Sequence, residues 1–184
     1  ISAVPTSVEL LMDADEPTLY CADEQHDVAV DLGRYARLAR HVLEAERVPT
    51  DVEVSLLFVD EAAITEYNER FLDGTGPTDV LSFPIDDDVM PGGRHPDHGG
   101  SGPGSGDELG APPSILGDVL VCPSYAQRSA AERGIALDDE LALLVVHGLL
   151  HLLGHDHAEP DETARMQQRE REHLASFAAA EGAA

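Results

Sequence analysis

Three histidines near the C-terminal end of the chain have the spacing of metal ligands. His147 and His151 are four residues apart in an apolar run, and His157 follows in the same segment, VHGLLHLLGHDH. In a helix, this spacing places the first two imidazoles on one face, one turn apart. Gly154 favours the end of that helix, because glycine readily adopts the left-handed conformation found at helix C-termini. The chain can then turn and bring His157 back as a third ligand.

This ligand set predicts a catalytic zinc site with one Zn²⁺ per chain. Three neutral histidines with a fourth position open to water are typical of catalytic zinc, whereas structural zinc sites are closed. His155 is an alternative third ligand, although His157 has the better spacing. Asp156 is a candidate to orient a ligand imidazole, as metal-bound histidines commonly require.

The spacing of the three histidines also resembles the metzincin zinc motif, with a glycine three residues after the second histidine. Metzincins carry a glutamate directly after the first histidine, and that glutamate is the base for peptide hydrolysis. Gly148 occupies this position here, so the peptidase interpretation lacks its base. Zinc lowers the pKa of a bound water toward about 7 and polarises a phosphoryl oxygen. Hydrolysis of a phosphate ester therefore requires no side-chain base.

Hydrophobic periodicity indicates strands alternating with helices, followed by a helical C-terminal part. This order predicts an α/β or α+β fold, arranged in three layers around a small sheet. Asp31 and Asp60 are candidate N-caps, and the acidic residues 16–27 are expected to form an irregular connection. We expect strands at residues 7–12, 51–59, 80–83 and 118–122, and helices at residues 31–47, 60–71, 124–133, 138–153 and 160–177.

Length and composition favour one domain spanning residues 1–184. With 42% hydrophobic residues, the chain has enough apolar material for a single core. Residues 86–114 concentrate glycine and proline and are predicted to form a flexible loop. The longest apolar run ends at His147 and is far shorter than the ~20 residues of a membrane span. No export signal is evident at the N-terminus, so we expect a cytoplasmic protein without membrane contact.

The charge balance argues against a general nucleic-acid-binding surface. The chain has 36 acidic residues and 11 basic ones, all arginine, for a formal net charge of −25. Such a charge opposes binding to phosphate backbones at ordinary salt. A basic surface has to be local, and the candidates near the histidine motif are Arg128, Arg133, Arg165, Arg169 and Arg171.

Three sequence blocks, in this order, resemble the YbeY family of bacterial metal-dependent endoribonucleases. They are PTDVLSFP at residues 77–84, LGDVLV at residues 116–121 and HGLLHLLGHDH at residues 147–157. With the segments between them, the resemblance covers roughly residues 51–177. It implies a small mixed four-stranded sheet packed with about five helices, with the zinc site on a helix of the C-terminal half and the turn after it.

The resemblance also implies a site and a function. One zinc would be held by His147, His151 and His157, and the partner would be single-stranded RNA, as ribosomal RNA or a ribosomal subunit. The expected role is maturation of the small-subunit 3′ end and ribosome quality control. Residues 78–82 would border the cleft. Within them, Thr78 and Asp79 are candidates either to cap the loop or to contact substrate, and Ser82 is a further cleft candidate.

Two positions depart from the family pattern. Most members have tyrosine at His155, and many have an arginine where Leu72 stands, so no arginine is assigned to the substrate phosphate. Zinc-bound water and the RNA 2′-hydroxyl are both possible nucleophiles. The alternatives are a zinc-dependent hydrolase of another substrate, and a non-catalytic ribosome assembly factor with a structural zinc.

Overall fold

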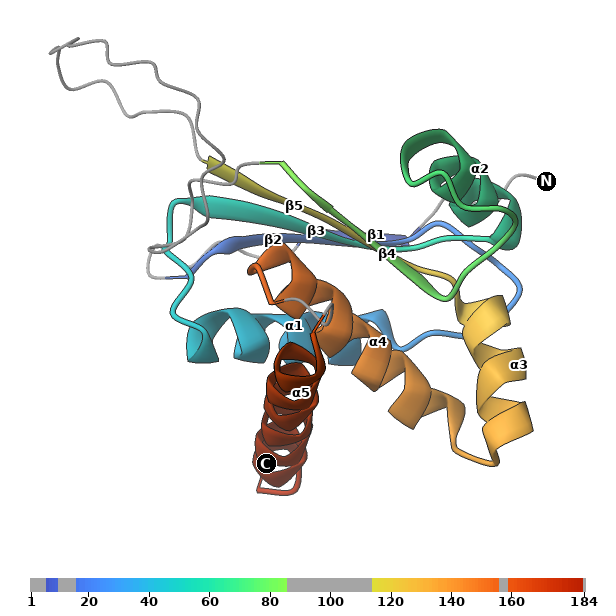
Figure 1. Cartoon of the computed structure of the whole chain (residues 1–184). Helices are drawn as coiled ribbons and strands as arrows, with labels where there is room; N and C mark the ends of the chain where they lie inside the picture. The colour runs from blue at the N-terminus through green and yellow to red at the C-terminus, as the bar shows by residue number, and fades with distance from the viewer. Residues whose placement is uncertain (1–5, 10–15, 86–113, 156–158, 184) are drawn as a thin grey trace, which may run out of the picture.

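The computed structural model describes residues 6–9, 16–85, 114–155 and 159–183. Within these ranges the chain forms five strands and five helices (Figure 1). The strands are β1 (Thr6–Glu9), β2 (Thr18–Asp23), β3 (Val52–Phe58), β4 (Val80–Pro84) and β5 (Ser114–Val121). The helices are α1 (Leu32–Ala45), α2 (Glu61–Phe71), α3 (Pro123–Arg133), α4 (Leu137–Leu152) and α5 (Pro160–Glu181).

The described strands make one mixed sheet in the order β1-β2-β3-β5-β4. The central strand β3 pairs in parallel with β2 and β5, and the outer pairs β1–β2 and β4–β5 are antiparallel. The predicted α+β fold, with a mixed sheet and five helices, is confirmed. The sheet has five strands rather than the expected four.

The additional strand is β2, in a segment predicted to be irregular. Leu19 and Cys21 are buried and Tyr20 between them is exposed, which is the alternation of a strand. Leu19 pairs with Val54 and Cys21 with Leu56 on β3. Acidic residues flank this short alternation on both sides and hide it in the sequence. Pairing with a buried neighbour therefore decides the conformation, and local propensity does not.

Strand β5 begins four residues earlier than predicted, at Ser114. Its first half is irregular, because Gly117 has a φ of +147° and the register with β3 shifts between Glu53 and Val54. Such a bulge disturbs the simple alternation by which strands are predicted. The rest of the predicted loop at residues 86–114, and the end of the predicted first strand at residues 10–12, lie outside the described residues.

The predicted helix boundaries agree closely with the structure. Asp31 and Asp60 are N-caps, and their carboxylates accept hydrogen bonds from the backbone N–H of Arg34 and Ala63 at 3.0 and 2.8 Å. Helix α4 ends at Leu152, and Gly154 follows with the predicted left-handed φ, of +82°.

The helices lie on both faces of the sheet. Figure 1 shows α2 on one face and α1, α4 and α5 on the other.

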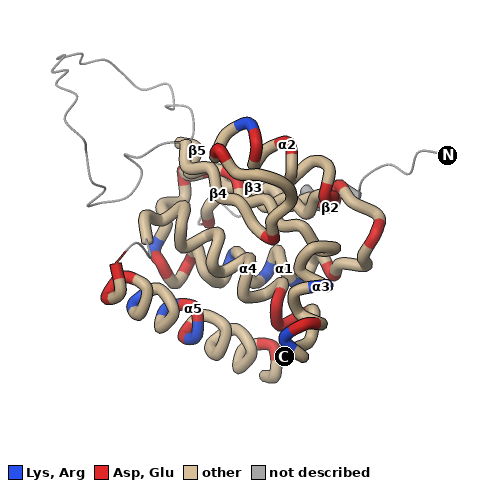
Figure 2. The backbone as a smooth tube through the Cα atoms, turned by 45° about the vertical axis from the view of Figure 1, so that its right-hand side comes forward, with Lys and Arg blue, Asp and Glu red and all other residues tan. Residues whose placement is uncertain are grey.

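Acidic residues are spread over the molecule, whereas the described arginines, apart from Arg47, all lie in helices (Figure 2). No helix in the described ranges has the length and apolar character needed to cross a membrane.

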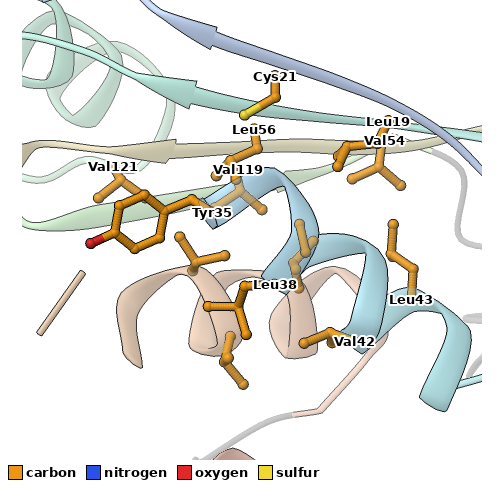
Figure 3. Packing of buried hydrophobic residues seen from close by; sticks show 14 of the residues in the cluster. Leu19, Cys21, Tyr35, Leu38, Val42, Leu43, Val54, Leu56, Val119 and Val121 are labelled. Carbon is orange, nitrogen blue, oxygen red and sulfur yellow. The ribbon is translucent and has the colours of Figure 1, made fainter. Parts of the chain in front are cut away.

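The main core fills the space between the sheet and the helices α1 and α4. Leu38 and Val42 of α1 are buried against the sheet side that carries Val54, Leu56 and Val119 (Figure 3). Almost all of α4 after its first turn is buried, because it is packed against the sheet, α1 and α5. This packing fixes which face of α4 remains accessible.

Helix α4 approaches β4 and β5 most closely at Gly148. A Cβ atom at this position would lie 2.5 Å from Val119 Cγ1, a separation that real Cβ atoms essentially never show. Ser82 Oγ on β4 donates a hydrogen bond to the Gly148 carbonyl at 3.0 Å. The helix can lie this close to the sheet only because residue 148 has no side chain.

We therefore predict that Gly148→Ala destabilises the protein. Overpacking against Val119 should lower the free energy of unfolding by about 1–3 kcal/mol. The matched control is Gly33→Ala in α1, whose Cβ would meet no atom closer than 3.5 Å. This variant should gain about 0.5–1 kcal/mol from helix propensity. Chemical denaturation measures both changes, and an equally stable Gly148→Ala variant would contradict this account of the packing.

Candidate metal centre

Helix α4 presents His147 and His151 together on its accessible face. Their ring centroids lie 4.6 Å apart, and the two planes are nearly perpendicular at 79°. The neighbouring residues Val146, Gly148 and Leu150 are buried, so the core occupies the other faces of the helix. The two imidazoles therefore lie side by side and remain partly exposed, which is the arrangement that two ligands of one metal require.

A carboxylate on α5 holds the ring of His147. Glu170 Oε1 lies 2.8 Å from His147 Nδ1, and Glu170 is only 8% exposed. When Nδ1 carries its proton and donates to this carboxylate, the lone pair of the ring is on Nε2. Such a partner fixes the tautomer and raises the basicity of a ligand histidine. In this tautomer, Nε2 is the nitrogen of His147 that can bind a metal.

Sequence reasoning missed Glu170 and assigned the orienting role to Asp156. Glu170 lies 23 residues beyond His147, and it is one of many acidic residues in α5. Its pairing with His147 depends on how α5 packs against α4, which local spacing does not reveal. Asp156 and the predicted third ligand His157 lie outside the described residues. Within the described ranges, the structure brings together two of the three predicted ligands.

His155 occupies a different environment from the histidine pair. It lines a second cavity of about 530 Å³ with Arg165 and Arg169 of α5, whereas His147 lines another cavity. Burial lowers the pKa of the His155 imidazole, although the negative charge of Glu46 opposes this effect. Its backbone N–H donates to the Leu150 carbonyl at 3.0 Å and so helps to close the helix end.

The cavity beside His147 has a volume of about 460 Å³ and is lined by α3, α4, α5 and the start of β4. Cavities of this size hold small ligands in other proteins. His147, Glu170 and Asp79 are among the polar residues that line it. Leu144 and Met166 add apolar surface.

The block at residues 77–84 mainly positions β4. Asp79 Oδ1 accepts hydrogen bonds from the Val80 N–H at 2.9 Å and from Thr78 Oγ1 at 3.2 Å. Ser82 binds the Gly148 carbonyl, and the Asp79 carbonyl accepts from the Cys122 N–H at 2.8 Å. Of the three predicted cleft residues, Asp79 lines the cavity beside His147. Thr78 donates a hydrogen bond to Asp79 and Ser82 donates one to the Gly148 carbonyl, and neither residue lines the cavity.

Carboxylates pair with most of the arginines near the site. Arg128 binds Glu61, and Arg133 binds Glu140. Arg169 binds Glu46 and Glu172, at 2.6 and 3.0 Å. Positive charge around the candidate site is therefore largely compensated, as the acidic composition suggests.

The position of the family's usual arginine has no cationic replacement from α2. Leu72 is the C-cap of α2 and is exposed. The guanidinium of Arg70 lies over the ring of Phe71, and its Nη1 lies 3.9 Å from Glu66 Oε1. Arg70 is thus engaged on its own helix.

The donor set fits a metal that accepts imidazole nitrogen, and zinc is such a metal. Gly148 gives a steric reason for the missing peptidase base, because a glutamate at this position would collide with Val119. The site is therefore unsuited to the metzincin mechanism.

Comparison with known proteins places this geometry in a family. The sequence model described as endoribonuclease YbeY matches residues 20–178. The endoribonuclease YbeY of Beutenbergia cavernae is 45% identical over 152 residues, which cover 83% of this chain and 92% of that protein. The endoribonuclease YbeY of Thermobifida fusca is 45% identical over 150 residues, covering 82% of this chain and 88% of that protein.

A solved structure agrees with the fold. A protein of Thermotoga maritima, determined in solution, superposes with a TM-score of 0.52 at 25% identity, over 82% of this chain and 85% of that one. The residues that the sequence model matches include β3, β4, β5, helices α1 to α4 and most of α5, and therefore the histidine pair and Glu170. The chain belongs to the endoribonuclease YbeY family.

Proposed function

We propose that this chain is a zinc-dependent endoribonuclease that cleaves single-stranded RNA. The observation that carries the proposal is the pair of imidazoles on α4, one of them held by Glu170, beside a cavity of ligand size. The name of the relatives supports RNA as the substrate. The three sequence blocks support ribosomal RNA, with roles in maturation of the small-subunit 3′ end and in ribosome quality control in the cytoplasm.

In this proposal, one zinc is held by His147, His151 and His157. Imidazole nitrogens are ordinary zinc ligands, and the turn at Gly154 leads directly to the segment that contains His157. When bound, zinc supplies a Lewis acid that polarises a phosphoryl oxygen and lowers the pKa of a bound water.

The chain's own residues orient the ligands and shape the space beside them. Glu170 Oε1 accepts a hydrogen bond from the Nδ1–H of His147, so the ring cannot turn without losing this partly buried bond. Leu144 and Met166 are buried and present apolar surface to the cavity. The carboxylates of Asp79 and Glu170 repel a phosphate, so binding a phosphate here would require the positive charge of the bound zinc.

The purified protein should contain about one zinc per chain. Substitution of both His147 and His151 by alanine should abolish binding, because it leaves at most one of the proposed ligands. Elemental analysis after dialysis measures the metal content. Full zinc content in the double variant would rule out this ligand set.

Glu170→Gln should weaken zinc binding by about 10- to 100-fold, since partners of ligand histidines typically contribute this much. The glutamine keeps the shape of the side chain but removes the negative charge behind His147. Competition with a chromophoric chelator measures the affinity. Glu172→Gln on the same helix is the control, because its carboxylate binds Gln168 and Arg169 instead. Equal affinities in the two variants would refute the orienting role of Glu170.

The zinc-loaded protein should cleave an end-labelled single-stranded RNA. His151→Ala should reduce the rate on the order of 10²-fold or more, because the metal is the main source of transition-state stabilisation. His26→Ala is the control, because His26 is exposed and lies far from the histidine pair in the sequence. A zinc-replete protein with no RNA cleavage would favour the assembly-factor alternative, or a hydrolase of another substrate.

The ends of the RNA products identify the nucleophile. Attack by water leaves one new hydroxyl and one phosphate monoester, whereas attack by the 2′-hydroxyl first forms a 2′,3′-cyclic phosphate. An RNA with a single 2′-deoxynucleotide at the cleaved position separates the two routes independently, since only the second route requires the missing group.

A further inference from the structure

Arg133 is a cation that lines the cavity beside His147. Among the described residues around this cavity it is the one arginine, whereas Arg165 and Arg169 line the second cavity. Arg133 lies in the last turn of α3, and its side chain is 48% exposed. The guanidinium is therefore accessible to a ligand that enters the cavity from solvent.

Two side chains hold the guanidinium of Arg133 in place. Glu140, in the first turn of α4, is 1% exposed, and its Oε1 accepts a hydrogen bond from Arg133 Nη2. Ser129, one turn earlier in α3, accepts from the same Nη2 through its Oγ at 3.2 Å and from Nε through its carbonyl at 3.4 Å. A buried carboxylate is costly unless it is paired, so Glu140 favours this one orientation of Arg133. The orientation of the guanidinium is thus fixed before a ligand binds.

The bonds that hold Arg133 leave part of its guanidinium for a ligand. Arginine carries five N–H donors in a planar fork. Within the described part of the chain, the bonds to Glu140 and Ser129 use Nε and Nη2, so they leave the two N–H groups of Nη1. The planar fork of arginine matches the oxygens of a phosphate, and pairing with a carboxylate leaves that geometry unchanged.

Arg133 and the histidine pair lie at different places along the cavity. Glu140, to which Arg133 is bonded, precedes His147 by seven residues on α4, which is about 10 Å along the helix axis. One phosphate does not span this separation, because hydrogen bonds and metal–oxygen bonds are only about 2–3 Å long. A polymer with a phosphate in every unit can occupy both places with two different phosphates.

The charges at the two places differ. Glu170 bonds to His147, so its negative charge acts beside the candidate metal centre. At the other place the carboxylate is Glu140, and Arg133 balances its charge. A phosphate near Arg133 therefore meets N–H donors beside a neutral ion pair, which is a less repulsive environment than the one beside Glu170.

We propose that Arg133 binds a backbone phosphate of the RNA that neighbours the cleaved phosphate in the same strand. This inference rests on the proposed function, because the strand is the one cleaved at the metal centre. Phosphate contacts fix the position of a nucleic acid and carry no base specificity. The contact with Arg133 thus sets which phosphate lies at the histidines, and it does so without a broad basic surface.

Fluorescence anisotropy with an end-labelled, single-stranded 2′-O-methyl RNA measures binding to the zinc-loaded protein, and electrophoresis checks that the probe stays intact. Arg133→Gln should weaken the affinity about tenfold, the order of effect of a hydrogen bond to a charged group. The slope of log K against log salt should become shallower by about 0.7, because each phosphate contact in a single strand contributes this much. A purely structural role of Arg133 would change the melting temperature and leave this slope as it is.

The matched control is Arg128→Gln, which also removes an arginine of α3 that is bonded to a glutamate. Arg128 does not line the cavity, so this variant should keep the affinity and the salt slope of the wild-type protein. Equal losses in the two variants would indicate a general effect of charge and overturn the inference. Unchanged affinity and slope in Arg133→Gln would overturn it as well.

Two further measurements cover the case in which Arg133→Gln does not fold, because this variant leaves Glu140 buried without its counter-charge. The double variant Arg133→Gln, Glu140→Gln removes both charges and should show the same loss of affinity and slope. The wild-type protein can also be tested with probes that carry one uncharged methylphosphonate each. Besides the cleaved position, one neighbouring position should lower the affinity about tenfold. Sensitivity at the cleaved position alone would overturn the inference.

Cleavage of unmodified RNA separates failure of this inference from failure of the proposed function. Cleavage by Arg133→Gln with the kcat and KM of the wild-type protein rejects the phosphate contact and leaves the nuclease function intact. Binding that depends on Arg133, without cleavage, rejects the nuclease function and retains the contact. A wild-type protein that neither binds nor cleaves RNA rejects both.

Discussion

The close packing of α4 against the sheet is the constraint on which the candidate site depends. Gly148 allows the helix backbone to lie against Val119, and Ser82 fixes the contact with a hydrogen bond to the Gly148 carbonyl. Because the other faces of α4 are buried in the core, the side chains of His147 and His151 can point only toward the accessible face. The direction of the two imidazoles is thus set by packing, and the same packing removes the space in which a peptidase base would stand.

The many acidic residues determine the charge around the candidate site as well as the net charge of the chain. Three of the five arginines near the histidine motif are paired, with Glu61, Glu140 and Glu46, so they give the surface little net positive charge. An RNA-cleaving enzyme with this charge balance cannot rely on a broad basic surface for affinity. Recognition through the proposed metal centre needs far less positive charge on the surface.

Much of the fold could be predicted from the sequence, because its strongest signals are local. The caps Asp31 and Asp60 and the helix end at Gly154 each depend on residues within one turn. The pair of His147 and His151 likewise follows from helical spacing alone. Strand β2 and the early start of β5 were not predicted, since both depend on pairing with β3 and, for β5, on the bulge near Gly117.

Two buried glutamates at the site were not predicted for the same reason, because their partners lie in other segments of the chain. Glu170 and Glu140 are two glutamates among 36 acidic residues, and nothing in their neighbourhood in the sequence distinguishes them. Among the acidic residues that the structure describes, these two are the buried ones, one against His147 and the other against Arg133. Burial of a carboxylate is costly unless a partner compensates it. The partners, His147 for Glu170 and Arg133 for Glu140, come from other parts of the chain and meet these carboxylates only in the folded protein.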